Sequence, residues 1–262
     1  MKAKLAMSDK FLARHVYVDP HHVSEDKPCH VVDMPHWGSF ETPLGYDYLR
    51  RGKLQTVGYH AFRLLLDAIA WFVTTFFLGV KIRGRRNIKK IHGGFVSIAN
   101  HVQTLDCAMV LRMLKGRRTY FLSLESNFVI TCVGQFVRWG GAVPVSTHFR
   151  QLHELVASMN EALRLGDAVH VYPETALVPY CDHLRPFATG AFYLAVVNHV
   201  PMVLFAITQR PRKGLWKLIK RKPCFTVTCL SPIYPNAALR RVDAVHELAE
   251  NCWQAMHAVI DA

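Results

Sequence analysis

Residues 95–114 read FVSIANHVQTLDCAMVLRML, and this stretch decides the fold. Its first five residues are apolar or small, which is typical of a strand buried on both faces of a sheet. After a polar turn, apolar residues return at helical spacing up to Leu114. A buried strand that leads directly into a helix is the repeating unit of α/β proteins with a parallel sheet.

The same alternation continues to the end of the chain. Further strands are expected at 120–124, 142–146, 169–172, 202–208 and 225–230. Helices are expected at 104–114, 127–137, 150–164, 188–198 and 242–260. The sequence therefore predicts an α/β fold with a mostly parallel central sheet flanked by helices, and such sheets place their chemistry in loops at the carboxyl ends of the strands.

Before this alternation lies an apolar helical segment at residues 57–80. Its uninterrupted apolar part, Ala68–Val80, has thirteen residues, fewer than the ~20 that span a bilayer. Arg63 and Asp67 are four residues apart, so they are expected to pair on one helix face. The segment has four large aromatic residues and is followed by a basic run: Trp71, Phe72, Phe76, Phe77 and then Lys81, Arg83, Arg85, Arg86, Lys89, Lys90.

Aromatic side chains beside a basic run favour a helix that lies in an anionic membrane interface. The alternative is a buried helix of a soluble core. We expect a membrane-associating N-terminal element in residues 1–80, made of an irregular extension and this helix, and an α/β domain in residues 81–262.

Composition limits the class of protein. The chain has 262 residues, of which 51% are hydrophobic and 19% are charged, which excludes a disordered chain and a polytopic membrane protein. Lys and Arg outnumber Asp and Glu by 32 to 19, for a net charge of +13, so anionic partners are expected. No nucleic-acid-binding motif is present, and we therefore expect no nucleic acid partner.

The cysteines and histidines indicate neither disulfides nor a metal. None of the seven cysteines forms a CxxC pair, and no secretory signal is present, so we expect reduced thiols facing the cytosol. Several histidines occur at irregular spacing near the N-terminus without a Cys/His quartet, and no metal site is expected: His15, His21, His22, His30 and His36.

His101 and Asp106 are the clearest candidates for catalysis. An aspartate that accepts a hydrogen bond from one imidazole nitrogen leaves the other nitrogen available as a general base. The HxxxxD spacing alone is weak support, because His21 and Asp26 repeat it in the irregular extension. Only His101 stands at a strand–loop–helix junction. The alternative reading is a structural loop histidine.

Three other segments place polar groups near strand ends. In VYPET, Glu174 and Thr175 follow a strand, and Glu174 is a candidate acceptor of a hydrogen bond from a substrate hydroxyl; a solvated carboxylate is the alternative. Gly141 makes a tight turn into the strand that precedes Arg150, and Thr175, Gly141 and Arg150 are further candidates for substrate binding. Arg185 follows the VYPET loop. Farther along, Val-Pro at 200–201 opens the next strand.

These four blocks, in this order over residues 80–235, resemble the lysophosphatidate and glycerol-phosphate acyltransferase family, the PlsC-like enzymes. The family blocks are NHxxxxD, a Gly-rich strand ending in Arg, a (F/Y)PEG-type loop and a VP strand. The resemblance implies acyl transfer from an acyl-CoA or acyl carrier protein thioester to a hydroxyl, with His101 as base and Asp106 as its orienter. It implies no cofactor beyond the donor substrate. Family members typically have an N-terminal helical anchor.

Two departures concern the acceptor. The family's third block runs PEGTR, whereas Thr175-Ala176-Leu177 follows Glu174 here, so its Gly and Arg are missing. The family's second-block Arg falls on Thr147, and Arg150 lies three residues farther on. Because arginines recognise phosphate well, Arg150 and Arg185 are expected to substitute.

The expected reaction is therefore acylation of a lysophospholipid, with 1-acylglycerol-3-phosphate as the first choice, at the cytoplasmic face of a membrane. The alternatives are a family member that acts on a different hydroxyl acceptor, and a non-catalytic lipid-binding member. The sequence leaves the oligomeric state open.

Overall fold

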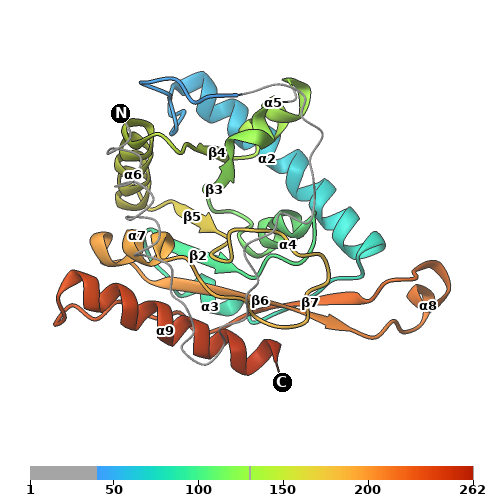
Figure 1. The fold of residues 1–262 in the computed structure, drawn as a ribbon. Helices are drawn as coiled ribbons and strands as arrows, with labels where there is room; N and C mark the ends of the chain where they lie inside the picture. Colours follow the sequence, from blue (N-terminus) through green and yellow to red (C-terminus); the bar gives the residue numbers. More distant parts are fainter. Residues whose placement is uncertain (1–39, 130, 262) are drawn as a thin grey trace, which may run out of the picture.

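The computed structural model describes residues 40–129 and 131–261, and these form one sheet covered by helices on both faces (Figure 1). The seven strands are β1 (Lys81–Arg83), β2 (Phe95–Ala99), β3 (Thr119–Leu124), β4 (Ala142–Val145), β5 (Ala168–Val171), β6 (Met202–Arg210) and β7 (Cys224–Cys229). Their order in the sheet is β1-β7-β6-β2-β5-β3-β4. Neighbours pair in parallel except β6 and β7, which are antiparallel.

Helices separate the strands along the chain. They are α2 (Lys53–Phe72), which continues as the π-helix η1 (Val73–Phe77), α3 (Arg86–Lys89), α4 (Asp106–Met113), the 3₁₀-helix η2 (Glu125–Phe128), α5 (Thr131–Trp139), α6 (Phe149–Arg164), α7 (Gly190–Asn198), α8 (Leu215–Ile219) and α9 (Arg241–Ile260). The predicted mostly parallel α/β fold is confirmed.

The core has two layers because strand side chains alternate between the faces of the sheet. In β2, Val96 and Ile98 pack with α6, α7 and α9 on one face. Phe95 and Ala99 pack with α4 and the end of α2 on the other face. All five β2 residues are buried, as a central parallel strand requires.

The structure adds elements that the sequence did not indicate. Each expected strand is present, but β1 was read only as part of a basic run. Its Lys81-Ile82-Arg83 sequence alternates exposed charge with one apolar residue, as an edge strand does. The antiparallel direction of β7 was also missed, since a strand's sequence does not encode which way its neighbour runs. The connection from β6 to β7, residues 211–223, contains the short helix α8.

The N-terminal helix is longer than its apolar run suggested. Arg63 and Asp67 form the expected pair, with Nε and Oδ1 2.9 Å apart. Both side chains are buried against the protein, and the Arg63 guanidinium also donates to backbone carbonyls of Leu111, Leu114 and Arg117. The charges that interrupt the apolar run therefore face inward.

By length and composition alone, the helix Lys53–Phe77 could cross a membrane: it has 25 residues, and an 18-residue window of it has a mean hydropathy of 1.3. The helix is thus longer than its thirteen-residue apolar run, and its interfacial placement stays a prediction. Its outer face carries large exposed apolar side chains: Leu54, Val57, Leu64, Leu65, Ile69, Trp71, Phe72, Phe76 and Phe77. The division into 1–80 and 81–262 stays a prediction; within the described chain, Tyr48 already packs into the core of the α/β part.

Candidate active site

Asn100, the residue after β2, extends the pairing of β2 with β6. It is fully buried, its Nδ2 donates to the Ile207 carbonyl at 2.9 Å, and its Oδ1 accepts from the Ile207 amide at 2.8 Å. The side chain thus replaces backbone pairing where the chain turns out of the sheet. This fixes the point at which His101 leaves β2. The sequence motif includes Asn100, but its pairing was not predicted.

His101 and Asp106 are in contact, as predicted. His101 Nδ1 lies 2.6 Å from Asp106 Oδ2. Asp106 is the first residue of α4, and its side chain is 1% exposed, whereas that of His101 is 23% exposed. An ionised Asp106 accepts the Nδ1 hydrogen, which leaves Nε2 of a neutral His101 as a lone-pair base. The catalytic role of the pair stays a prediction.

Two aromatic residues of the β5 segment support the His101 ring. The Tyr172 ring stacks on it, with ring centroids 4.2 Å apart and 17° between the planes. Burial, and then the nearby Asp106 carboxylate, raise the pKa of Tyr172 well above its ordinary value, so its hydroxyl stays protonated. The Tyr172 ring in turn meets His170 edge-on at 4.7 Å.

His170 is a second histidine that sequence reasoning missed. It is 1% exposed, and its Nδ1 lies 3.0 Å from Ser97 Oγ. Burial, followed by the charge of His101, lowers the pKa of His170 to about 3. It is therefore neutral near pH 7. Its position inside an otherwise apolar strand run was the available signal.

Glu174 holds two loops together. Its Oε2 accepts from the His101 amide at 2.8 Å and from Arg185 Nη2 at 2.8 Å, and its Oε1 accepts from the Arg185 amide at 3.0 Å. The carboxylate is 1% exposed. These contacts make Glu174 a positioning group for His101. A hydrogen bond to a substrate hydroxyl stays a prediction.

Arg185 is brought into the site, as expected, because loop 175–185 folds back. Its side chain is 15% exposed, pairs with Glu174, and donates to the carbonyl of Ala176. Its Nε is buried without a hydrogen-bond partner among the described residues. The described part of the protein therefore does not use every donor of this guanidinium.

Thr175 adopts a backbone conformation that usually requires glycine. Its φ is +62°, in the left-handed region that a β-branched residue rarely adopts. It is the residue at the Gly position of the PEG-type block. The exposed side chain makes no hydrogen bond within the described chain that would assign it a substrate contact.

The structure does not bring Arg150 and Gly141 to His101. Arg150 is exposed in the first turn of α6, which follows the edge strand β4. β4 lies three strand spacings from β2, or about 14 Å. Gly141 precedes β4 and so lies at the amino ends of the strands, whereas His101 lies at their carboxyl ends. The φ of Gly141 is +99°, and a Cβ there would lie 2.3 Å from the Thr119 carbonyl oxygen. Its role is therefore a tight turn.

No group of three or more His, Cys, Asp or Glu side chains in residues 40–129 and 131–261 could hold a metal ion. The N-terminal histidines and the second HxxxxD pair, His21 and Asp26, lie outside the described residues. The described cysteines are free thiols: Cys107, Cys181, Cys224, Cys229 and Cys252.

The chain is similar to known acyltransferases. Residues 79–208 match the family model "Acyltransferase". Over 200 residues the chain is 28% identical to human 1-acyl-sn-glycerol-3-phosphate acyltransferase beta, a match that covers 73% of this chain and 69% of the relative. The fold resembles the crystal structure of PlsC, the 1-acyl-sn-glycerophosphate (LPA) acyltransferase of Thermotoga maritima. That match has a TM-score of 0.56 and 17% identity, and it covers 82% of this chain and 86% of that one.

The family model spans the segment that carries the His101–Asp106 pair, the Glu174 loop and strands β2 to β6. The same blocks carry the resemblance seen in the sequence. The chain belongs to the acyltransferase family of enzymes.

Proposed function

We propose that the protein is an O-acyltransferase of phospholipid biosynthesis. It moves a fatty acyl group from the thioester of acyl-CoA or acyl carrier protein to the hydroxyl of a lysophospholipid, with 1-acylglycerol-3-phosphate as the preferred acceptor. The observation that carries this proposal is the 2.6 Å contact of His101 with the buried Asp106 at the carboxyl end of β2. The name of the human relative supports the choice of acceptor.

In the proposed reaction, His101 Nε2 takes the proton of the acceptor hydroxyl as the oxygen attacks the thioester carbonyl carbon. Asp106 stabilises the imidazolium that forms. The tetrahedral intermediate collapses, the carbon–sulfur bond breaks, and the imidazolium returns its proton to the thiolate that leaves. The products are the acylated lipid and the free thiol of the carrier. No metal or further cofactor takes part in this scheme.

The supports of His101 come from three directions. Asp106 holds Nδ1, Tyr172 covers one face of the ring, and Glu174 holds the backbone amide. A base that is fixed in this way needs little reorganisation when the acceptor arrives. The geometry therefore favours a catalytic enzyme over a non-catalytic lipid-binding member.

The acceptor phosphate is assigned to Arg185, because its guanidinium pairs with Glu174, the residue that also accepts from the His101 amide. Arg150 is the weaker choice, because it stands at the sheet edge. If the acceptor carries a phosphate, Arg185→Ala raises its KM by about tenfold or more, since a charge-assisted hydrogen bond is worth about 1.5–3 kcal/mol. The donor KM stays nearly constant. An unchanged acceptor KM, or preference for a phosphate-free acceptor, would leave acyl transfer to a different hydroxyl.

The deciding experiment gives purified full-length protein a labelled acyl donor and a panel of lysolipids and other hydroxyl acceptors, with products identified by mass. His101→Ala should abolish transfer without unfolding the protein, and Asp106→Asn should lower turnover strongly but less. The matched control is His246→Ala, because His246 is an exposed histidine near the start of α9. Wild-type turnover in His101→Ala would exclude the mechanism.

We further propose that the enzyme works on the cytoplasmic face of an anionic membrane. The exposed apolar face of α2 and η1 supplies the apolar contact. The β6–β7 connection adds a second one beside it: Phe76 and Phe77 of η1 line a hollow with Leu215, Trp216 and Lys220. Residues 211–223 contain six basic residues and no acidic ones, namely Arg212, Lys213, Lys217, Lys220, Arg221 and Lys222. Such a surface suits anionic lipid.

A further inference from the structure

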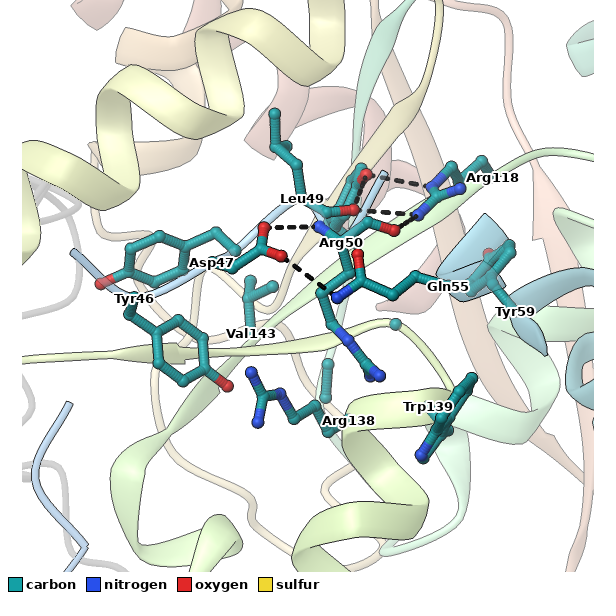
Figure 2. Close-up of a pocket in the computed structure, with 14 residues that line it drawn as sticks. Tyr46, Asp47, Leu49, Arg50, Gln55, Tyr59, Arg118, Arg138, Trp139 and Val143 are labelled. Carbon is teal, nitrogen blue, oxygen red and sulfur yellow. Dashed lines mark hydrogen bonds between the residues drawn. The ribbon is translucent and has the colours of Figure 1, made fainter. Parts of the chain in front are cut away.

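A second concave site lies at the amino-terminal edge of the sheet, opposite to His101. It is a shallow hollow, partly open to solvent, between the beginnings of β3 and β4, the start of α2 and residues 46–50 (Figure 2). The hollow lies at the amino ends of the strands and His101 at the carboxyl ends, so the length of a strand of four to six residues separates them. At about 3.3 Å per residue, the two sites are more than ~13 Å apart.

Two arginines face this hollow from different segments. Arg50 comes from the chain before α2 and Arg138 from α5, and both line the hollow; in Figure 2 the guanidinium group of Arg50 lies toward Trp139 and that of Arg138 toward Tyr46. Arg50 lies over the ring of Trp139, at 4.4 Å from Cζ to the ring centroid. Arg138 lies over the ring of Tyr46 at 4.6 Å. Stacking on aromatic rings orients the two planar groups but leaves their N–H edges available.

Neither guanidinium has an anionic partner within residues 40–129 and 131–261, where no ion pair involves Arg50 or Arg138. Arg138 Nε is buried without a hydrogen-bond partner there. Among the residues that line the hollow, Asp47 alone is acidic. Its carboxylate accepts from the Arg50 amide at 2.8 Å and from Gln55 Nε2 at 3.4 Å, not from a guanidinium.

The walls of the hollow are firmly held. The guanidinium of Arg118 donates to Tyr120 Oη at 3.0 Å and to the carbonyls of Leu49 and Arg50 at 2.9 and 3.0 Å. These bonds fix the backbone that carries Arg50. Two like charges held close without a counter-ion repel each other, and an anion between them removes that cost.

We propose that this hollow binds the phosphate group of an anionic phospholipid, with Arg50 and Arg138 as its two donors. Arginine presents paired N–H groups that match phosphate oxygens. The lipid source is favoured because the hollow lies beside the first turns of α2, where the exposed apolar side chains of Leu54 and Val57 could receive acyl chains. The hollow does not include His101, so anion binding there does not depend on acyl transfer.

The test measures binding of the full-length protein to two kinds of vesicle, phosphatidylcholine alone and phosphatidylcholine with a minor fraction of phosphatidylglycerol. The variant Arg50→Gln/Arg138→Gln should weaken binding to the anionic vesicles by about tenfold or more, since charge-assisted hydrogen bonds to phosphate are lost. The control Arg240→Gln/Arg241→Gln loses the same charge from the exposed start of α9 and should bind nearly as the wild type does. The more conservative Arg50→Lys/Arg138→Lys keeps the charge and should be intermediate, because Lys lacks the fork.

A second arm separates a lipid headgroup from free phosphate. The Tm of each protein is measured with inorganic phosphate and with chloride at equal ionic strength, against its own ligand-free Tm. If phosphate raises the Tm of the wild type and not of Arg50→Gln/Arg138→Gln, while vesicle binding is equal in both, the lipid assignment is overturned in favour of free phosphate. If the pocket variant and the α9 control behave alike in both arms, there is no phosphate site. Turnover in detergent should persist in the pocket variant whichever ligand is bound.

Discussion

At the scale of single residues, Thr175 combines a glycine backbone with a β-branched side chain. The left-handed conformation costs a residue with a Cβ about 1–2 kcal/mol. The loop holds Thr175 in this conformation through its two neighbours. The Ala176 amide donates to the Glu174 carbonyl at 2.7 Å, and this bond fixes the turn. The strain therefore lies directly beside the proposed active site.

Thr175→Asn should stabilise the protein. Asn tolerates the left-handed region and does not add the unfolded-state entropy of glycine. We expect a gain of about 0.5–1 kcal/mol, or roughly 1–4 °C in Tm for a chain of this size. Thr147→Asn is the control, since Thr147 is an exposed loop threonine without a positive φ. A lower Tm for Thr175→Asn would mean that the Thr175 side chain is itself stabilising.

His170 makes a prediction about acid stability. Its pKa is about 3 when folded and 6.5 as the ordinary value. Between these values the unfolded chain binds a proton that the folded protein does not, so stability falls as pH drops, by up to about 1.4 kcal/mol per pH unit. His170→Gln should flatten this decline in urea unfolding measured from pH 7 downward, whereas His246→Gln, an exposed histidine of α9, should not. Equal pH slopes for the wild type and His170→Gln would show that His170 is not held neutral.

At the scale of elements, the site is an assembly of two loops at one sheet edge. The β2–α4 loop supplies His101, and the β5–α7 loop supplies Glu174 and Arg185. The Val178 amide donates to the His101 carbonyl at 3.2 Å, and the Tyr180 amide to the Val102 carbonyl at 2.8 Å. Backbone hydrogen bonds therefore hold the β5–α7 loop against the β2–α4 loop.

The Glu174–Arg185 pair should couple stability to function. Arg185→Gln leaves a buried carboxylate with one partner fewer and should cost about 3 kcal/mol of unfolding free energy. Adding Glu174→Gln removes that charge and should restore part of the loss. If the acceptor KM stays high in the stabilised double variant, Arg185 binds the phosphate directly. If it returns to normal, Arg185 acts only by holding Glu174. Additive stability losses would contradict the coupling itself.

At the scale of the whole molecule, the apolar side of α2–η1 and the basic β6–β7 connection lie on one flank (Figure 1). The two segments are more than 130 residues apart in the chain, as the Arg210–Gly79 contact shows with a separation of 131. Together they present an apolar strip beside a cluster of cations. This arrangement fits a helix lying in the interface, because one side of α2 is committed to α4 and cannot also face lipid.

Membrane binding should therefore need both segments. Leu218 is 85% exposed, and Leu218→Glu should weaken sedimentation with anionic vesicles several-fold, because it places a charge in the lipid contact. Val242→Glu, on α9 and 65% exposed in the wild type, is the control. High salt should release only part of the wild-type protein, since the apolar contact is not screened. Complete release by salt would exclude an interfacial helix.

Local pattern was enough to predict much of this protein. The α/β class, the six strands from β2 to β7 and the His101–Asp106 contact all follow from short-range periodicity, because buried strands and helix starts are encoded within a few residues. The Arg63–Asp67 pair follows for the same reason.

Other features depend on which strand lies beside which, and this is a long-range property. Only the tertiary structure placed Gly141 at the far edge from His101, kept Arg150 about three strands away, and turned Arg63 inward so that α2 presents an apolar face. The stacking of Tyr172 on His101 and the lining of one hollow by Arg50 and Arg138 likewise join segments far apart in sequence. Local sequence does not encode such contacts between distant segments, because the core as a whole decides the strand order and the packing of loops over the sheet.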